Sequence, residues 1–210
     1  MRAFIEANTA PARPAFVPEI VLHLATEITP AWQATEDWLQ QRNVPPPFWA
    51  FAWPGSQALA RHVLDHPDLV RGKRVLDFAA GCGLAAIACA MAGAATVEAA
   101  DIDPFALAAT ELNAEQNHVA VGILDGDVVG LACRWDLILC GDVCYEAPMT
   151  AHILPWLRRM RRECDVWIAD PGRAYLPAGE HDLATYDIPT TLELEDRLAR
   201  QTRLFSLPPA

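Results

Sequence analysis

The chain has 210 residues, of which 52% are hydrophobic, and its formal net charge at pH 7 is −11. This length suits one domain with a sizeable core, and the hydrophobic content excludes a disordered chain. The acidic balance argues against nucleic acid as the main partner, because phosphate binding needs clustered Lys and Arg. The same charge is compatible with a lysine-bearing protein surface as substrate.

The cysteines, histidines and apolar runs indicate the cellular compartment. The six cysteines form no CxxC pair and the six histidines no HExxH pattern, so the sequence predicts buried thiols and no metal site. No run of about 18 residues lacks both charge and proline, and no cationic stretch followed by an apolar segment opens the chain. We therefore expect a cytoplasmic monomer that does not bind membranes.

The first 55 residues are punctuated by prolines and end in the aromatic run PPPFWAFAWPG. Residues 19–24 predict a short strand, and residues 31–42 predict a helix with apolar side chains at helical spacing. Ser56 is placed to cap a helix that follows the aromatic run. That run suits either the core or the mouth of a cofactor or substrate site.

Residues 75–83, VLDFAAGCG, predict a strand, a glycine turn and the start of a helix. Glycines in such a turn let a ligand approach the backbone, and the N–H groups that open the helix point at the ligand. Gly81-x-Gly83-x-x-Ala86 matches the dinucleotide fingerprint. The longer pattern, Asp77 followed by three residues and Gly-x-Gly, resembles motif I of class I methyltransferases that use S-adenosyl-L-methionine (AdoMet). A turn that binds no ligand is the third alternative.

Strand and helix patterns alternate from residue 75 to residue 170, which predicts a parallel α/β sheet. The second strand ends in Asp101, where a doubly wound fold recognises a ribose. The third leads into the turn Asp125–Asp127, and the fourth into Asp142. We expect strands at 95–100, 119–124, 135–140, 166–169, 183–190 and 202–207, and helices at 104–117 and 153–160.

Five stretches occur in order along the chain: FWAFAWPGSQALARHVL, VLDFAAGCGLAAIA, AADIDPFAL, LNAEQN and DLILCGDVCYE. Together with the opening FIEANT, they resemble the seven-β-strand protein-lysine methyltransferases that carry a DxxY/F motif after the fourth strand. The most similar branch methylates lysines of the electron-transfer flavoprotein β subunit, in its bacterial form. The likeness covers nearly the whole chain.

This resemblance implies a Rossmann-like, doubly wound sheet of seven strands, mostly parallel with an antiparallel last strand. It also implies AdoMet as cofactor and S-adenosyl-L-homocysteine as product. Residues 1–210 would form a single methyltransferase domain, in which residues 1–55 cover the mouth of the cofactor and substrate site and residues 56–210 form the core.

Family roles carry over position by position. On the cofactor side, the resemblance implies that Asp101 binds the ribose and that the other contacts come from Trp53, Asp77, Gly81, Gly83, Asp127 and Val128, with Asn113 in support. On the substrate side, Asp142 and Tyr145 would face the incoming lysine. Phe78 departs from the Asp/Glu-Leu-Gly of many relatives, which loosens the match at that position.

The expected reaction is attack of a neutral lysine amine on the sulfonium methyl group. With a reference pKa of about 3.9, Asp142 is a poor general base, so we expect it to orient the amine through a hydrogen bond. An ordinary turn acid at a strand end is the alternative for Asp142. For the chain, the alternatives are a methyltransferase for a ribosomal protein or a small amine, an AdoMet-binding module without catalysis, and an NAD-dependent oxidoreductase.

Overall fold

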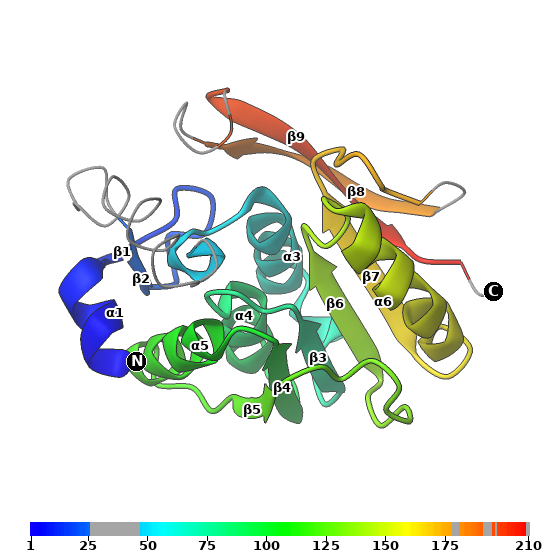
Figure 1. Cartoon of the computed structure of the whole chain (residues 1–210), viewed down its shortest axis with the longest axis horizontal. Helices are drawn as coiled ribbons and strands as arrows, with labels where there is room; N and C mark the ends of the chain where they lie inside the picture. Colours follow the sequence, from blue (N-terminus) through cyan, green and yellow to red (C-terminus); the bar gives the residue numbers. More distant parts are fainter. Residues whose placement is uncertain (26–46, 178–180, 191–194, 196, 209–210) are drawn as a thin grey trace.

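The structure is a computed structural model that describes residues 1–25, 47–177, 181–190, 195 and 197–208. Within these residues, seven strands form one sheet in the order β5–β4–β3–β6–β7–β9–β8 (Figure 1). Neighbours are parallel except for β7–β9 and β9–β8, which are antiparallel. The predicted mostly parallel sheet with an antiparallel last strand is therefore confirmed. Its strands are β3 (Arg74–Phe78), β4 (Thr96–Asp101), β5 (Gly122–Asp125), β6 (Leu137–Gly141), β7 (Asp165–Asp170), β8 (His181–Pro189) and β9 (Ala199–Ser206).

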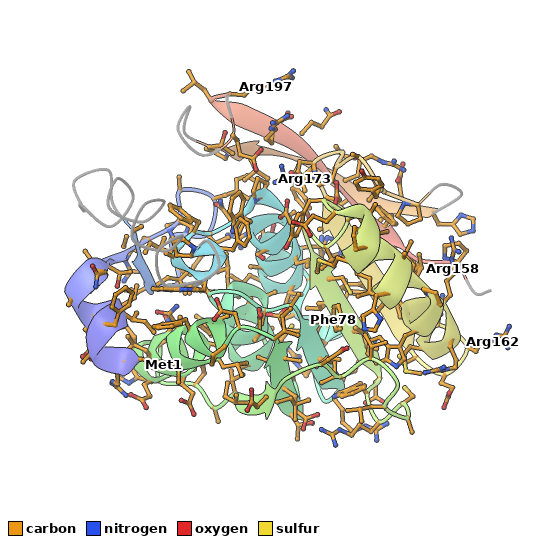
Figure 2. All side chains as sticks on the ribbon, viewed as in Figure 1. Met1, Phe78, Arg158, Arg162, Arg173 and Arg197 are labelled. Carbon is orange, nitrogen blue, oxygen red and sulfur yellow. The ribbon has the colours of Figure 1, made fainter. Side chains whose placement is uncertain are left out.

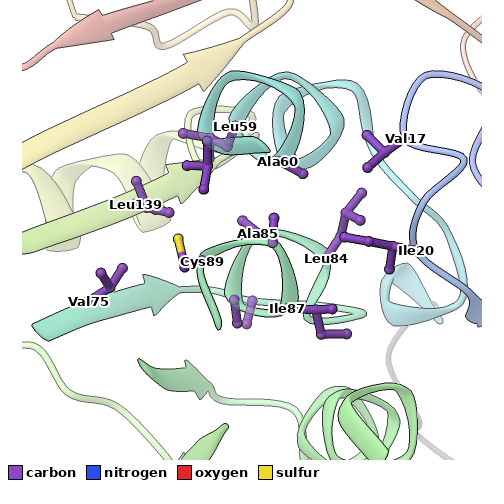
Figure 3. Close-up of a cluster of buried hydrophobic side chains, with 14 of the residues drawn as sticks. Val17, Ile20, Leu59, Ala60, Val75, Leu84, Ala85, Ile87, Cys89 and Leu139 are labelled. Carbon is purple, nitrogen blue, oxygen red and sulfur yellow. The ribbon is translucent and has the colours of Figure 1, made fainter. Parts of the chain in front are cut away.

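Helices cover both faces of the sheet, as the buried central strands require. One face packs against α3 (Pro54–Asp65), α4 (Leu84–Met91) and α5 (Pro104–Gln116), and the other against α6 (Ala147–Met160). Figure 3 shows the first interface, where Leu59 lies near Leu139 and Leu84 lies beside Ile20, all fully buried. This packing fixes the carboxyl ends of β3 and β6 relative to the first turns of α3 and α4.

The N-terminal segment packs on α5 at the rim of the sheet. It contains α1 (Arg2–Asn8), the antiparallel pair β1 (Ala10–Ala12) and β2 (Leu22–Leu24), and the 3-10 turn η1 (Phe48–Ala50). A second 3-10 turn, η2 (Pro67–Leu69), follows α3. The strand predicted at 19–24 is thus present as the shorter β2, and the helix predicted at 31–42 lies outside the described residues.

Several predicted boundaries were wrong, and among them the last strand, β9, begins at Ala199 and not at residue 202. Ser56 does not cap α3: the helix begins at Pro54 with Trp53 as N-cap, because proline's fixed φ suits the first helical position. The third strand begins at residue 122 and not 119, because pairing with β4 starts only there. The helix predicted from 153 begins at Ala147, directly after the DxxY segment.

Candidate active site

A cavity of about 710 Å³ opens at the carboxyl ends of β3, β4 and β6. Ligands bind at this edge of doubly wound sheets, and the volume is in the usual range for small-molecule sites. Most of the predicted site residues line this single cavity: Trp53, Gly81, Asp101, Asp127, Val128, Asp142 and Tyr145.

The two glycines of the β3–α4 turn are required for different reasons. Both have left-handed backbone, with φ of +54° at Gly81 and +76° at Gly83. A Cβ at Gly81 would meet no atom within 4 Å, so the backbone there borders open cavity. A Cβ at Gly83 would lie 2.7 Å from Cγ2 of Thr110 on α5, so this glycine permits close packing beneath the turn.

Asp77 and Gly83 do not line the cavity. Asp77 is 3% exposed, and its Oδ2 accepts a hydrogen bond from the Ala86 N–H at 2.9 Å, which ties the end of β3 to the first turn of α4. Burial raises the pKa of Asp77 to about 8. The predicted contact of these two residues with the methionine moiety stays a prediction.

Asp101 is anchored by backbone at the end of β4. Its Oδ2 accepts from the Gly81 N–H at 2.9 Å and its Oδ1 from the Asp103 N–H at 3.0 Å. A carboxylate offers about four acceptor positions, so Asp101 can still accept a hydrogen bond from a hydroxyl donor. The next side chain, Ile102, is 77% exposed at the cavity, so it offers an apolar surface beside the carboxylate. Sequence reasoning missed Ile102, although its place directly after the strand-end acid was a usable signal.

Asn113 joins the N-terminal segment to the glycine turn. It is fully buried on α5, donates to the Cys82 carbonyl at 2.9 Å and accepts from the His23 N–H of β2 at 2.7 Å. Asn117, one helical turn later, accepts from the Val21 N–H at 2.9 Å. The predicted support by Asn113 therefore has a structural basis in these two hydrogen bonds.

Asp142 follows β6 in left-handed backbone, with φ of +55°. Its Oδ2 accepts from the Gly55 N–H at 2.5 Å, in the first turn of α3. A side chain at Gly55 would lie 2.4 Å from the Ala169 carbonyl, so only glycine allows the helix to approach so closely. Burial raises the pKa of Asp142 to about 7, although Arg173 acts in the opposite direction. The carboxylate lies at the N-terminus of α3, which, like Arg173, favours the ionised form and opposes the effect of burial.

Two further ionic residues at the site carry no sequence motif. Arg173 lines the cavity and donates to Asp142 Oδ1 from Nη2 at 2.9 Å and from Nε at 3.2 Å. Glu195, from the β8–β9 connection, is 3% exposed and pairs with Arg173. Sequence reasoning missed both, because they lie 31 and 53 positions from Asp142 and nothing in their local pattern indicates the pairing.

Aromatic rings form one wall of the cavity. Phe48 lies 5.9 Å from both Trp53 and Tyr145, measured between ring centroids. Arg173 lies 5.8 Å from the centroid of Trp53. Neighbouring Trp49 is buried against α5. The aromatic run therefore serves both purposes that the sequence left open, with some rings in the core and others at the mouth.

Metal binding and membrane insertion find no support in the described residues. Among the described residues, no group of three or more His, Cys, Asp or Glu side chains is arranged to hold a metal ion. Five of the six cysteines are buried, as expected of small core residues. The helices in the described part of the chain are too short or too polar to cross a membrane.

Comparisons with known proteins agree with this geometry. The family model of ribosomal protein L11 methyltransferase (PrmA) matches residues 58–141. The electron transfer flavoprotein beta subunit lysine methyltransferase of Xenopus laevis is 40% identical over 99% of this chain and 87% of that protein. Its Homo sapiens counterpart is 40% identical over 82% of this chain and 67% of that protein. This chain belongs to the electron transfer flavoprotein beta subunit lysine methyltransferase family.

As a member of this family, the protein is an AdoMet-dependent protein-lysine methyltransferase. The fold agrees. The crystal structure of a ribosomal protein L11 methylase from Lactobacillus delbrueckii subsp. bulgaricus superposes with a TM-score of 0.52 at 19% identity. The match covers 74% of this chain and 79% of that one.

The methyltransferase cavity suits AdoMet as methyl donor. Gly81 leaves room for a ligand against the backbone, Asp101 has free lone pairs for hydroxyl donors, and Ile102 presents an apolar face of the kind that a purine ring covers. Asp142 and Tyr145 line the same cavity. Donor and acceptor could therefore meet in one cavity.

Proposed function

We propose that this methyltransferase transfers methyl groups from AdoMet to lysine side chains of the electron-transfer flavoprotein β subunit. Relatives at about 40% identity over most of the chain are named for this activity, which supports this target. The observation that carries the proposal is the convergence of Gly81, Asp101, Asp142 and Tyr145 on one cavity.

On the cofactor side, we assign the ribose hydroxyls to Asp101 and the sugar edge to Gly81. Asp127 and Val128 line the cavity beyond Asp101, so they are the proposed adenine neighbours, and Trp53 flanks the cofactor from the opposite wall. Asp77 and Gly83 would act from beneath the turn, where they hold its shape.

On the substrate side, Asp142 and Tyr145 receive the lysine. A lysine of pKa about 10.4 is almost fully protonated near neutral pH, so forming the neutral amine costs roughly 4 kcal/mol. AdoMet, when bound, supplies an electrophilic methyl carbon. Asp142 accepts a hydrogen bond from the amine and aligns its lone pair, while Tyr145 forms an aromatic wall beside the methylene chain. Proximity and alignment can contribute roughly 7–11 kcal/mol, more than the deprotonation costs.

We also propose that residues 1–210 form one domain in which residues 1–55 cover the mouth of the site. The hydrogen bonds of Asn113 and Asn117 to the segment around β2 support this arrangement, as do the η1 rings that line the cavity. We further propose a cytoplasmic monomer that binds neither nucleic acid nor membranes, on the strength of the acidic charge. Size-exclusion chromatography with light scattering tests the oligomeric part.

The decisive assay mixes purified enzyme, labelled AdoMet and the purified flavoprotein, and maps modified residues by mass spectrometry. We expect label on lysines of the β subunit. The competing candidate is a ribosomal protein, because the L11 methyltransferase family matches residues 58–141. Label on ribosomal protein L11 with none on the flavoprotein would transfer the proposal to that substrate. Label on small amines alone would exclude both proteins.

A further inference from the structure

Asp142 is one end of a chain of partly buried ion pairs that reaches the C-terminal hairpin. Arg173, in the segment after β7, donates twice to Asp142 Oδ1, from Nη2 at 2.9 Å and from Nε at 3.2 Å. The guanidinium also pairs with Glu195, whose Oε2 lies 3.3 Å from Arg173 Nη1. Arg200 of β9 donates to the same Glu195 oxygen at 2.9 Å. Figure 2 shows Arg173 near the end of α3, apart from Arg158 and Arg162 beside α6.

The hydrogen bonds of Asp142 restrict where a substrate can bind it. A carboxylate offers about four acceptor positions. Arg173 occupies two of them on Oδ1, and the Gly55 N–H occupies one on Oδ2. One position remains for the incoming amine. The guanidinium therefore limits both the rotation of the carboxylate and the direction from which a hydrogen bond reaches it.

Charge gives Arg173 a second effect. The charged and titratable groups around Asp142 are Arg173, Asp170 at the end of β7, Tyr145 on its own segment and, one step removed, Glu195. Arg173 is the cation in direct contact, and the carboxyl is buried. Without a cationic partner, a buried carboxyl takes up a proton, and it would then be unable to accept in the same geometry.

Glu195 completes the arrangement. Its side chain is 1% exposed, and it engages both Arg173 and Arg200. A buried guanidinium needs partners for its remaining donors, and a carboxylate supplies them in the matching fork geometry. The β8–β9 connection thereby positions a residue of the cavity wall.

We propose that Arg173 is a positioning residue for methyl transfer, which holds the Asp142 carboxylate ionised and aimed into the cavity, and that Glu195 holds Arg173 in place. The inference rests on the proposed function, because it assigns the acceptor amine to Asp142. It extends the active site to the C-terminal hairpin, which the DxxY motif does not include.

Carboxyl-labelled ¹³C NMR tests the electrostatic part without any substrate. Loss of a signal in Asp142→Asn identifies the Asp142 resonance, which we expect to titrate near pH 7 in the wild-type protein. Arg173→Gln should raise this pKa by about one unit or more, which is a tenfold loss of the ionised form below the pKa. Arg173→Lys keeps the charge and should give an intermediate value. An unchanged pKa in both variants would overturn the inference.

Kinetics with the flavoprotein test the positioning part. At pH 7, Arg173→Gln should lower kcat/KM about tenfold or more, and the deficit should shrink by pH 9. The affinity for AdoMet, measured by calorimetry, should change by no more than about threefold. In an Asp142→Asn background, Arg173→Gln should cost almost nothing further, and Glu195→Gln should cost almost nothing further in an Arg173→Gln background.

Arg203→Gln is the matched control, because Arg203 lies on the same β8–β9 hairpin as Glu195 and pairs with exposed Asp182. It should leave both the Asp142 titration and kcat/KM unchanged. Fully additive losses in the double variants would show that Arg173 acts only through general stability, and would contradict the inference. If the wild-type enzyme leaves the flavoprotein unmethylated, the proposed function fails, and the Asp142 titration still decides the role of Arg173.

Discussion

We expect Asp101 to combine a structural and a binding role in one carboxylate. Its two backbone hydrogen bonds hold the turn that carries Gly81, and its remaining lone pairs border the cavity. Asp101→Ala should therefore weaken AdoMet binding about tenfold or more, since a hydrogen bond to a charged group contributes about 1.5–3 kcal/mol. Calorimetry measures this, with exposed Asp125→Ala at the end of β5 as control. Equal affinity in Asp101→Ala would remove Asp101 from the ribose role.

The raised pKa of Asp142 predicts that methyl transfer depends on pH. Its pKa is raised to about 7, so the carboxylate that should orient the amine forms only as the pH rises through that value. We expect kcat/KM to increase through pH 7 and to continue upward as the substrate lysine deprotonates. In Asp142→Asn the step near pH 7 should vanish and activity should fall about 100-fold, the order of one well-placed polar group.

The control for this prediction is the cofactor itself. AdoMet affinity should stay within about threefold of wild type in Asp142→Asn, because Gly55 and Arg173 anchor Asp142 in the part of the cavity that we assign to the substrate. A parallel collapse of cofactor binding would instead make Asp142 a structural or cofactor-binding residue.

At the scale of elements, the two glycines of the β3–α4 turn have different expected roles, Gly83 in packing and Gly81 in ligand binding. Both Gly81→Ala and Gly83→Ala incur about 1–2 kcal/mol of left-handed strain. Gly83→Ala adds a clash with Thr110, whose Cγ2 lies 2.7 Å from the new Cβ, so it should be the more destabilising by about 1–3 kcal/mol. Gly81→Ala, whose Cβ enters open cavity, should chiefly lose AdoMet affinity. Urea unfolding and calorimetry distinguish the two.

The clash can be tested directly with a second change in α5. Thr110→Ser removes the nearest atom, so Gly83→Ala combined with Thr110→Ser should recover part of the lost stability. Equal destabilisation by the two alanine variants, with no recovery, would show that strain alone explains the requirement for glycine at residue 83.

At the scale of the whole molecule, buried acids make stability fall as pH rises. The folded-state pKa of Asp77 is about 8 and that of Asp142 about 7, both above the unfolded value of about 3.9. Their stabilising effect is complete below pH 3.9 and is lost as the pH rises through the folded values. Buried His23 and His62 have lowered pKa values, so they oppose this trend only below about pH 6.5.

The informative window is therefore pH 6.5 to 8. There the free energy of unfolding of the free enzyme should decrease, with Asp77 contributing up to about 1.4 kcal/mol per pH unit. Asp77→Asn should flatten the curve by that amount, because an amide of the same shape does not ionise. Urea titrations at several pH values measure the slope. A slope that Asp77→Asn leaves unchanged would contradict the raised pKa.

The net charge of −11 bears on how the enzyme meets its substrate. A lysine-bearing surface should be steered toward an acidic protein, so kcat/KM for the flavoprotein should fall several-fold as salt rises from about 10 mM to about 150 mM. At saturating flavoprotein, kcat should barely change. A kcat/KM that is independent of salt would show that contacts other than long-range charge dominate recognition.

The sequence by itself determined the succession of strands and helices along the α/β core, the glycine turn and the acids at the ends of β4 and β6. These features depend on residues within a few positions of one another, and the period of the apolar pattern and the turn chemistry report them directly. The ordered motifs also carried the family resemblance, and most of the residues named from them line the cavity.

Tertiary structure alone decided which distant residues complete the site. Gly55 reaches Asp142 across 87 positions, Arg173 reaches it across 31, and Glu195 reaches Arg173 across 22. Thr110 explains the glycine at residue 83 from a different helix. No local pattern encodes such contacts, because they form only when the packing of α3 and the C-terminal hairpin against the sheet brings buried charges together.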